Sequence, residues 1–80
     1  MHIIDPFHVK SLYNKALIFG NQSRRNEEIE IYDKILEIDP NFLEAMNSKG
    51  VALQALGNND AAIEIFDKGE EMVDTFRSNW

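Results

Sequence analysis

The side chains of this sequence that could act in catalysis or bind a metal ion lack the partners that such chemistry requires. His2 and His8 are six residues apart near the start of the chain, without a cluster of further ligands beside them. Ser11, Ser23 and Ser48 have no neighbouring histidine to act as a general base. A metal site needs several converging ligands, and an activated serine needs a base. The sequence therefore predicts no metal site and no catalytic nucleophile.

Carboxylates are the most numerous candidate groups, and all of them except Asp5 and Glu44 fall within residues 27–39 and 60–74. Apolar residues recur every three or four positions in both segments, which places the acids on the polar sides of amphipathic helices. Glu30 with Lys34 and Glu64 with Lys68 form pairs at helical spacing, each worth about 0.2–0.5 kcal/mol. We interpret the carboxylates as solvated helix surface and predict neither enzymatic activity nor a bound cofactor.

Length and charge restrict the class of protein further. Eighty residues form one domain at most, and the net charge of −6 disfavours binding to nucleic-acid phosphates. Residues 1–26 carry four basic side chains against one acidic, whereas the remainder carries four against thirteen. No cysteine is present, and the longest apolar run, Ala16 to Phe19, is far too short for a membrane span. We expect a cytoplasmic protein without nucleic-acid or membrane partners.

Four helices account for the apolar pattern. The first is expected from Pro6 to about Asn21, after a cap at Asp5, with a local stop signal at Gly20 that the helix passes through. The second is expected over 24–38 and is ended by Pro40. The third is expected over 42–56, and the fourth over 60–73 with Ala62, Ile63, Phe66 and Val73 facing inward.

Two capping residues are expected between these helices. Ser23 is the best N-cap for the second helix. Asn41 is expected to cap the third, with Glu44 three positions later as in a capping box.

A repeat of 34 residues organises the chain. Aligning residues 9–42 with residues 43–76 gives eight identities without a gap: Lys15/Lys49, Ile29/Ile63, Glu30/Glu64, Ile31/Ile65, Asp33/Asp67, Lys34/Lys68, Glu37/Glu71 and Phe42/Phe76. A unit of two antiparallel helices cannot bury its apolar face alone and must stack on its neighbours. We divide the chain into a lead-in of residues 1–8, units of residues 9–42 and 43–76, and a final 77–80 that is a tail or the start of a third unit.

The two units resemble the tetratricopeptide repeat family. The second unit has the residue types that the family favours at Met46, Gly50, Leu53, Gly57, Ala62 and Phe66, and the first has them at Leu12, Ala16, Phe19, Ser23, Tyr32 and Pro40. The resemblance implies an all-α fold, in which antiparallel helix pairs stack as a short right-handed α-solenoid. Glu28 departs from the pattern, because it stands where the second unit has Ala62. It must reach water or find a basic neighbour such as Lys15 or Arg24.

The resemblance also implies a binding surface, the concave face formed by the first helix of each unit. Its residues would be Lys10, Tyr13, Asn14, Leu17 and Asn21 from the first helix and Glu44, Asn47, Ser48, Val51, Gln54 and Ala55 from the third. One version of the family holds acidic C-terminal peptides with lysine, arginine and asparagine. Tyr13, Leu17 and Ser48 replace residues of that clamp, so we do not expect this ligand.

Two hypotheses for function follow. In the first, the chain is a protein–protein interaction module that binds a peptide or a helix in the concave groove, chiefly through Lys10, Tyr13, Asn14, Leu17, Asn21, Asn47, Val51 and Gln54. In the alternative, the chain is a self-associating structural module, a homo-oligomer in which another copy buries the open ends of the repeats.

Overall fold

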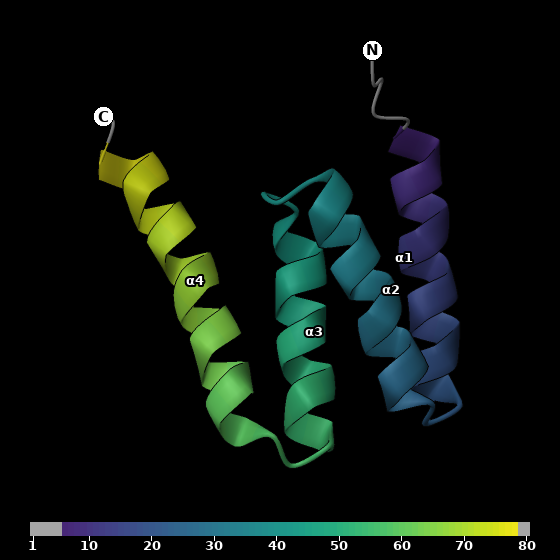
Figure 1. The fold of residues 1–80 in the computed structure, drawn as a ribbon. Coiled ribbons are helices and arrows are strands. Elements are labelled where there is room, and N and C mark those ends of the chain that lie inside the picture. The colour runs from purple at the N-terminus through teal and green to yellow at the C-terminus, as the bar shows by residue number, and fades with distance from the viewer. Residues whose placement is uncertain (1–5, 79–80) are drawn as a thin grey trace.

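The four expected helices are present in the computed structural model, which describes the backbone of residues 6–78 and the side chains of residues 7–73. They are α1 (Pro6–Asn21), α2 (Arg25–Ile38), α3 (Leu43–Ala55) and α4 (Asn59–Ser78), and no strand lies within residues 6–78 (Figure 1). The all-α fold class is confirmed. The expected cap at Asp5 lies outside the described residues, as do residues 79–80 of the expected tail or third unit.

Each helix packs on the next one along the chain, α1 on α2, α2 on α3 and α3 on α4 (Figure 1). This is the arrangement of a short tetratricopeptide solenoid. Its central cluster draws on α1, α2 and α3, with Val9, Ala16, Tyr32, Ile35 and Ala45 buried in contact with one another. Since that cluster contains residues of both helix pairs, the core forms only when the two pairs pack together.

The turns after α1 and α3 are alike, and the first of them corrects the role expected for Ser23. Ser23 has φ 60° and Gly57 has φ 84°, so each is a left-handed residue just beyond a helix end. In both turns the next amide reaches back five residues, from Arg24 to the carbonyl of Phe19 at 2.9 Å and from Asn58 to that of Leu53 at 2.9 Å. Ser23 therefore ends α1, and the N-cap of α2 is Arg24, which makes no side-chain capping bond.

The predicted capping box at Asn41 is also wrong. The N-cap of α3 is Phe42, which has no side-chain capping bond. Asp39 holds the turn instead, because its side-chain oxygen accepts a bond from the Asn41 amide at 3.1 Å. Such a turn is a common alternative to capping for aspartate, and it leaves the helix start one residue later than expected.

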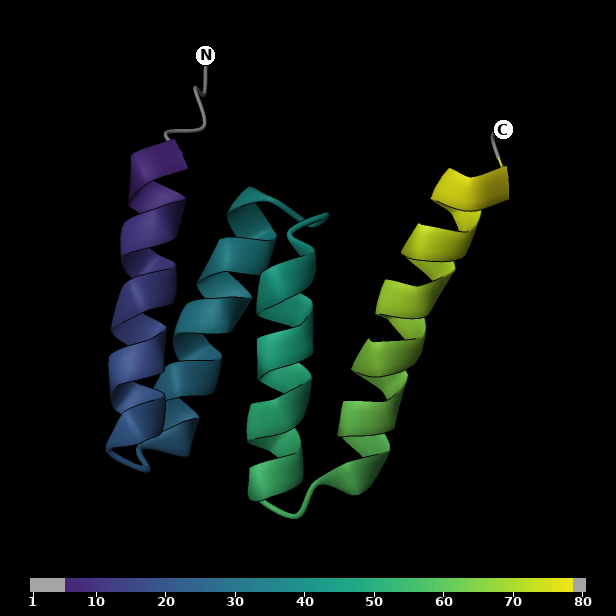
Figure 2. The same ribbon diagram turned by 180° about the vertical axis from the view of Figure 1, so that it is seen from behind.

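Helix α4 differs most from expectation. It continues to Ser78 instead of ending at Val73, since nothing in its sequence stops it. Ala62 is buried and Phe66 half-buried as expected, but Ile63 and Val73 are exposed. The helix diverges from α3 towards its C-terminal end (Figures 1 and 2). No helix of the described chain covers the far side of α4, which accounts for the exposed isoleucine.

Two buried glycines show how closely α3 and α4 approach each other at two points along their length. A Cβ atom at Gly50 would lie 2.4 Å from Cε1 of Phe66, closer than any real contact. At Gly69 the nearest atom to such a Cβ is Oδ1 of Asn47 at 3.8 Å, which is an ordinary contact distance. The helices are therefore in direct contact at Gly50 and leave room at Gly69, where the first unit has the fully buried Ile35.

Alanine at these two glycines should have opposite effects. Gly50→Ala should lower the free energy of unfolding by about 1–2 kcal/mol, because the ring of Phe66 must move. Gly69→Ala should raise it by about 0.5–1 kcal/mol, because helix propensity improves and nothing clashes. Urea unfolding followed by circular dichroism measures both. A gain in stability from Gly50→Ala would contradict the close approach.

The two left-handed positions provide a second matched pair. Ser23→Gly should raise the free energy of unfolding by about 0.5–1 kcal/mol, because glycine adopts a positive φ without steric strain. Gly57→Ser should lower it by about 1 kcal/mol for the converse reason. Thermal unfolding of both variants beside the parent chain is the measurement, and equal shifts in the same direction would refute the two turn assignments.

Candidate protein-binding surface

The residues expected to bind a partner lie on the face shared by α1 and α3. Seven of them have exposed side chains: Lys10, Asn14, Leu17, Asn21, Asn47, Val51 and Gln54. Leu17 and Val51 occupy equivalent places in the two units and are 42% and 56% exposed, so each helix contributes an accessible apolar side chain to this face. Amide side chains flank both. The face thus offers apolar contact area bordered by groups that donate and accept hydrogen bonds.

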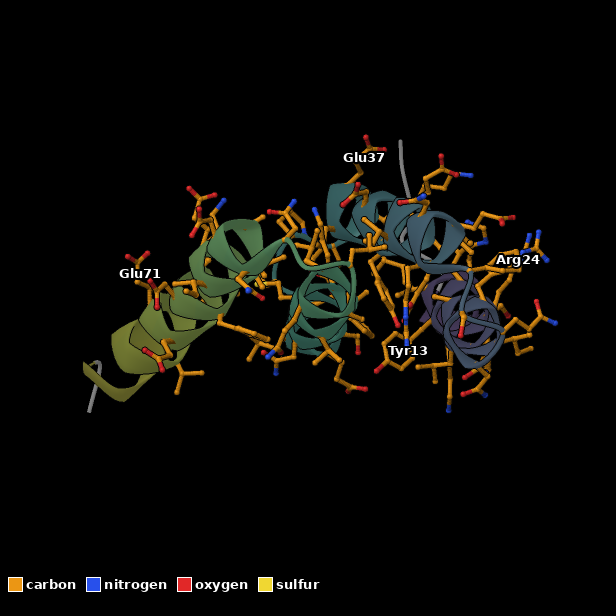
Figure 3. The ribbon with its side chains drawn as sticks, turned by 90° about the horizontal axis from the view of Figure 1, so that it is seen from below. Tyr13, Arg24, Glu37 and Glu71 are labelled. Atoms are coloured by element: carbon orange, nitrogen blue, oxygen red, sulfur yellow. The ribbon has the colours of Figure 1, made fainter. Side chains whose placement is uncertain are left out.

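Tyr13, the eighth of these residues, is half-buried because it joins the two units. Its hydroxyl is hydrogen-bonded to Oγ of Ser48 at 2.9 Å, and its ring centroid lies 6.0 Å from that of Tyr32 and 5.9 Å from that of Phe42. Figure 3 shows Tyr13 between α1 and α3, on the side of the array opposite Glu37. Tyr13 therefore fixes the two helices of this face relative to each other and leaves only part of its surface for a ligand.

A hollow of about 920 Å³ lies elsewhere, between α2, α3 and α4. The sequence did not indicate it, because it depends on how α4 diverges from α3 (Figure 1). Its apolar lining comes mainly from Leu36, Met46, Leu53, Ile65 and Met72, and Lys49, Glu64, Asp67, Lys68 and Glu71 provide its charged lining. None of the eight expected binding residues borders it. The chain therefore has two separate surfaces able to contact another molecule.

Glu28 is buried, with 5% of its surface exposed, and its partners come from its own helix. The hydroxyl of Tyr32 donates to Oε2 at 2.9 Å, and the guanidinium of Arg25 donates to Oε1 at 3.1 Å. A Cβ atom at Gly20 would lie 2.8 Å from Oε2, so this glycine makes room for the carboxylate. The expectation that Glu28 finds a basic neighbour is therefore confirmed, but that neighbour is Arg25 and not Lys15 or Arg24, and the alternative of exposure to water is wrong.

Arg24 contacts other groups instead. It forms a salt bridge with Glu27, and its guanidinium lies 4.6 Å from the ring centroid of Phe19. The partners of Glu28 were visible in the sequence, since Arg25 and Tyr32 lie three residues before it and four after it on one helix face. The space at Gly20 was not visible, because it depends on how α1 crosses α2.

Two properties of the described part of the chain bear on other classes of site. Three or more His, Asp or Glu side chains that could share a metal ion do not come together there. None of the described helices combines the length and the apolar character needed to cross a bilayer.

Comparison with known proteins identifies the class to which this fold and surface belong. Two sequence profiles of the tetratricopeptide repeat match, one over residues 9–42 and the other over residues 31–64. The chain belongs to the tetratricopeptide repeat family, and it is a repeat scaffold for protein–protein interaction.

Three known proteins are similar to this chain in sequence. Photosystem I assembly protein Ycf3 of Acaryochloris marina is 31% identical over 77 residues, which cover 95% of this chain and 46% of the relative. An uncharacterized protein of Sinorhizobium fredii is 37% identical over 71% of this chain and 30% of its own length. An uncharacterized protein of Methanocaldococcus jannaschii is 32% identical over 71% of this chain and 66% of its own length. The chain spans less than half the length of the first two.

The buried hydrogen bond between Tyr32 and Glu28 predicts a loss of stability at alkaline pH. Burial raises the pKa of Tyr32, and the neighbouring Glu28 carboxylate raises it further. A raised pKa means that the native state retains a proton that the unfolded chain releases above about pH 10, so the stabilisation is complete below pH 10 and is lost as pH rises.

The free energy of unfolding should therefore fall by as much as about 1.4 kcal/mol per pH unit above pH 10, and Tyr32→Phe should remove this component. At pH 7 the same substitution should cost about 1–3 kcal/mol, because the buried carboxylate loses a donor. Urea titrations at several pH values test both effects. Tyr13→Phe is the matched control, and equal alkaline slopes in Tyr32→Phe and the parent chain would refute the assignment.

Proposed function

We propose that this chain is a binding module that holds an extended peptide or a helix of a partner protein on the face shared by α1 and α3. The observation that carries the proposal is the exposed pair Leu17 and Val51, which occupy equivalent positions on the first helix of each unit. Apolar side chains of a ligand spaced to meet both would gain affinity from burial, and the amides of Asn14, Asn47 and Gln54 would bind its backbone.

Rigidity favours this face over a flexible one. The hydrogen bond between Tyr13 and Ser48 and the ring contacts of Tyr13 hold α1 and α3 in one relative position. A surface that is already ordered loses less conformational entropy when it binds a ligand. The name of the Acaryochloris relative describes an assembly protein, which is consistent with a scaffold that acts by holding other proteins and has no catalysis of its own.

Self-association is the second candidate function. The exposed Ile63 of α4 supports it: Ile29, at the equivalent place in the first unit, is half-buried, whereas Ile63 is 57% exposed. Another copy that covered the end of the stack would bury it. The cytoplasmic location and the absence of nucleic-acid and membrane partners stay predictions.

Substitutions on the two candidate surfaces should separate the proposed binding face from the hollow. A peptide selected from a displayed random library on the immobilised chain serves as the probe. Leu17→Glu and Val51→Glu should each weaken its binding, measured by calorimetry, at least about tenfold, because a hydrophobic contact is replaced by a charge. Both side chains are exposed, so the fold should be retained.

Met72→Glu in the hollow is the matched control and should leave the affinity within about twofold. Circular dichroism verifies that each variant is folded. If Met72→Glu abolished binding while the α1 and α3 variants did not, the hollow would be the binding site and the proposal would be wrong.

A further inference from the structure

One salt bridge joins the two units inside the chain. Nζ of Lys49 on α3 lies 2.5 Å from Oδ1 of Asp33 on α2. Ala45 and Ala52, four residues before and three after Lys49, share its helix face and are fully buried. On α2 the corresponding face contains Asp33 and, four residues earlier, the half-buried Ile29. The Asp33 side chain is 51% exposed, so the junction consists of a partly exposed ion pair beside a closely packed apolar contact.

The same two charged residues recur at the ends of the stack. Lys15 is the repeat equivalent of Lys49, and Asp67 is the repeat equivalent of Asp33. Both are exposed, and within the described residues neither side chain has a salt-bridge partner. Beside them Ile18 and Ile63, at the places of Ala52 and Ile29, are each 57% exposed. The two charged residues of the internal junction are therefore present at the two ends without their counterparts, and on α1 Ile18 replaces the buried Ala52.

Figures 1 and 2 show α1 and α4 at opposite edges of the array, with α2 and α3 between them. A helix from another molecule could therefore pack against either edge. We propose that α1 of one copy docks on α4 of a second copy in the register of the internal α2–α3 junction, with Lys15 of the first paired to Asp67 of the second. This inference rests on the self-association role and specifies its surface.

The proposed register brings exposed apolar residues together as well as opposite charges. Helices α2 and α3 are antiparallel, so the pairing of Asp33 with Lys49 brings the start of α2 near the end of α3. Repeating that geometry between copies brings Ile63 of α4 near Ile18 of α1. Burial of two isoleucines that are now more than half exposed favours the contact.

Charge favours a second copy as the occupant. Helix α1 contains Lys10 and Lys15 and no carboxylate. On α4, Asp67 and Glu70 lie three residues apart on the face that carries Ile63, so two carboxylates face the incoming lysine. These opposite charges attract over the Debye length, and salt weakens that attraction. The α1 face of this chain therefore complements its own α4 face.

The contact is heterologous, since it joins two different surfaces. Such contacts build open chains or closed rings instead of stopping at a symmetric dimer. They also leave Leu17 uncovered, because Lys15 and Leu17 point to opposite sides of α1, and only Asn14, four residues before Ile18, borders the contact. The arrangement extends the solenoid and lines up one binding face per copy.

Charge reversal tests the pairing. Sedimentation velocity should show the average mass of the parent chain rising with concentration and falling with added salt. Lys15→Glu and Asp67→Lys should each reduce the association constant at least about tenfold, because attraction becomes repulsion. Lys34→Glu is the matched control: it makes the same charge change at an exposed site of α2 and should leave association within about twofold.

Mixing the two deficient variants provides the sharper test. The altered end of Lys15→Glu complements the altered end of Asp67→Lys, and their unaltered ends form the original pair, so an equimolar mixture should regain the association of the parent chain. Circular dichroism verifies that both are folded.

A parent chain that stays monomeric at every concentration would overturn both the register and the self-association role, and would leave peptide binding by the α1 and α3 face unaffected. An associating parent whose variants associate equally well, or whose mixture gains nothing, would overturn the register alone.

Discussion

The contact between α2 and α3 is the interaction on which this small fold depends. A single pair of helices buries too little apolar surface to be stable, and the cluster around Tyr32 and Ile35 is complete only when Ala45 of the second pair covers it. Among the described helices, the two inner ones therefore pack closely on two neighbours, whereas α1 and α4 each pack closely on one. The difference between inner and outer helices follows from the stacking and needs no other cause.

The same asymmetry explains the surfaces of the molecule. The face of α1 and α3 is held in place by Tyr13, which lies at the boundary between the units. The hollow lies between α2, α3 and α4, where α4 diverges from α3 (Figure 1). The open ends carry Lys15 and Asp67, whose equivalents are paired inside the chain. Each surface is thus a consequence of where the stack is complete and where it stops.

Periodicity and the repeat were sufficient to predict the four helices, their order and most of their bounds. They failed at the short connections, where Ser23 and Asn41 each stand between the end of one helix and the start of the next. Sequence alone does not show whether such a residue ends the preceding helix or caps the following one. The left-handed conformation of Ser23 was identifiable only from its alignment with Gly57.

The contacts of buried side chains were the second feature that the sequence analysis did not predict. The partners of Glu28 could have been found by helical spacing, but the space that admits it depends on Gly20 in another helix. Ile63 was expected inside because its own unit calls for an apolar residue there. Its exposure depends on which helices pack around α4 in the whole stack, and the sequence of one unit does not specify those neighbours.

Amide hydrogen exchange on the dilute, monomeric chain tests whether stability comes from the stacking of the helices, because it measures the opening free energy of each helix separately. If stability comes from the stack, the amides in the middle of α2 and α3 should exchange most slowly, and those of α4 beyond Gly69 should exchange fastest among the helical residues. Equal protection of α4 and α2 would contradict the account, because it would mean that each helix pair is stable without the neighbour that covers it.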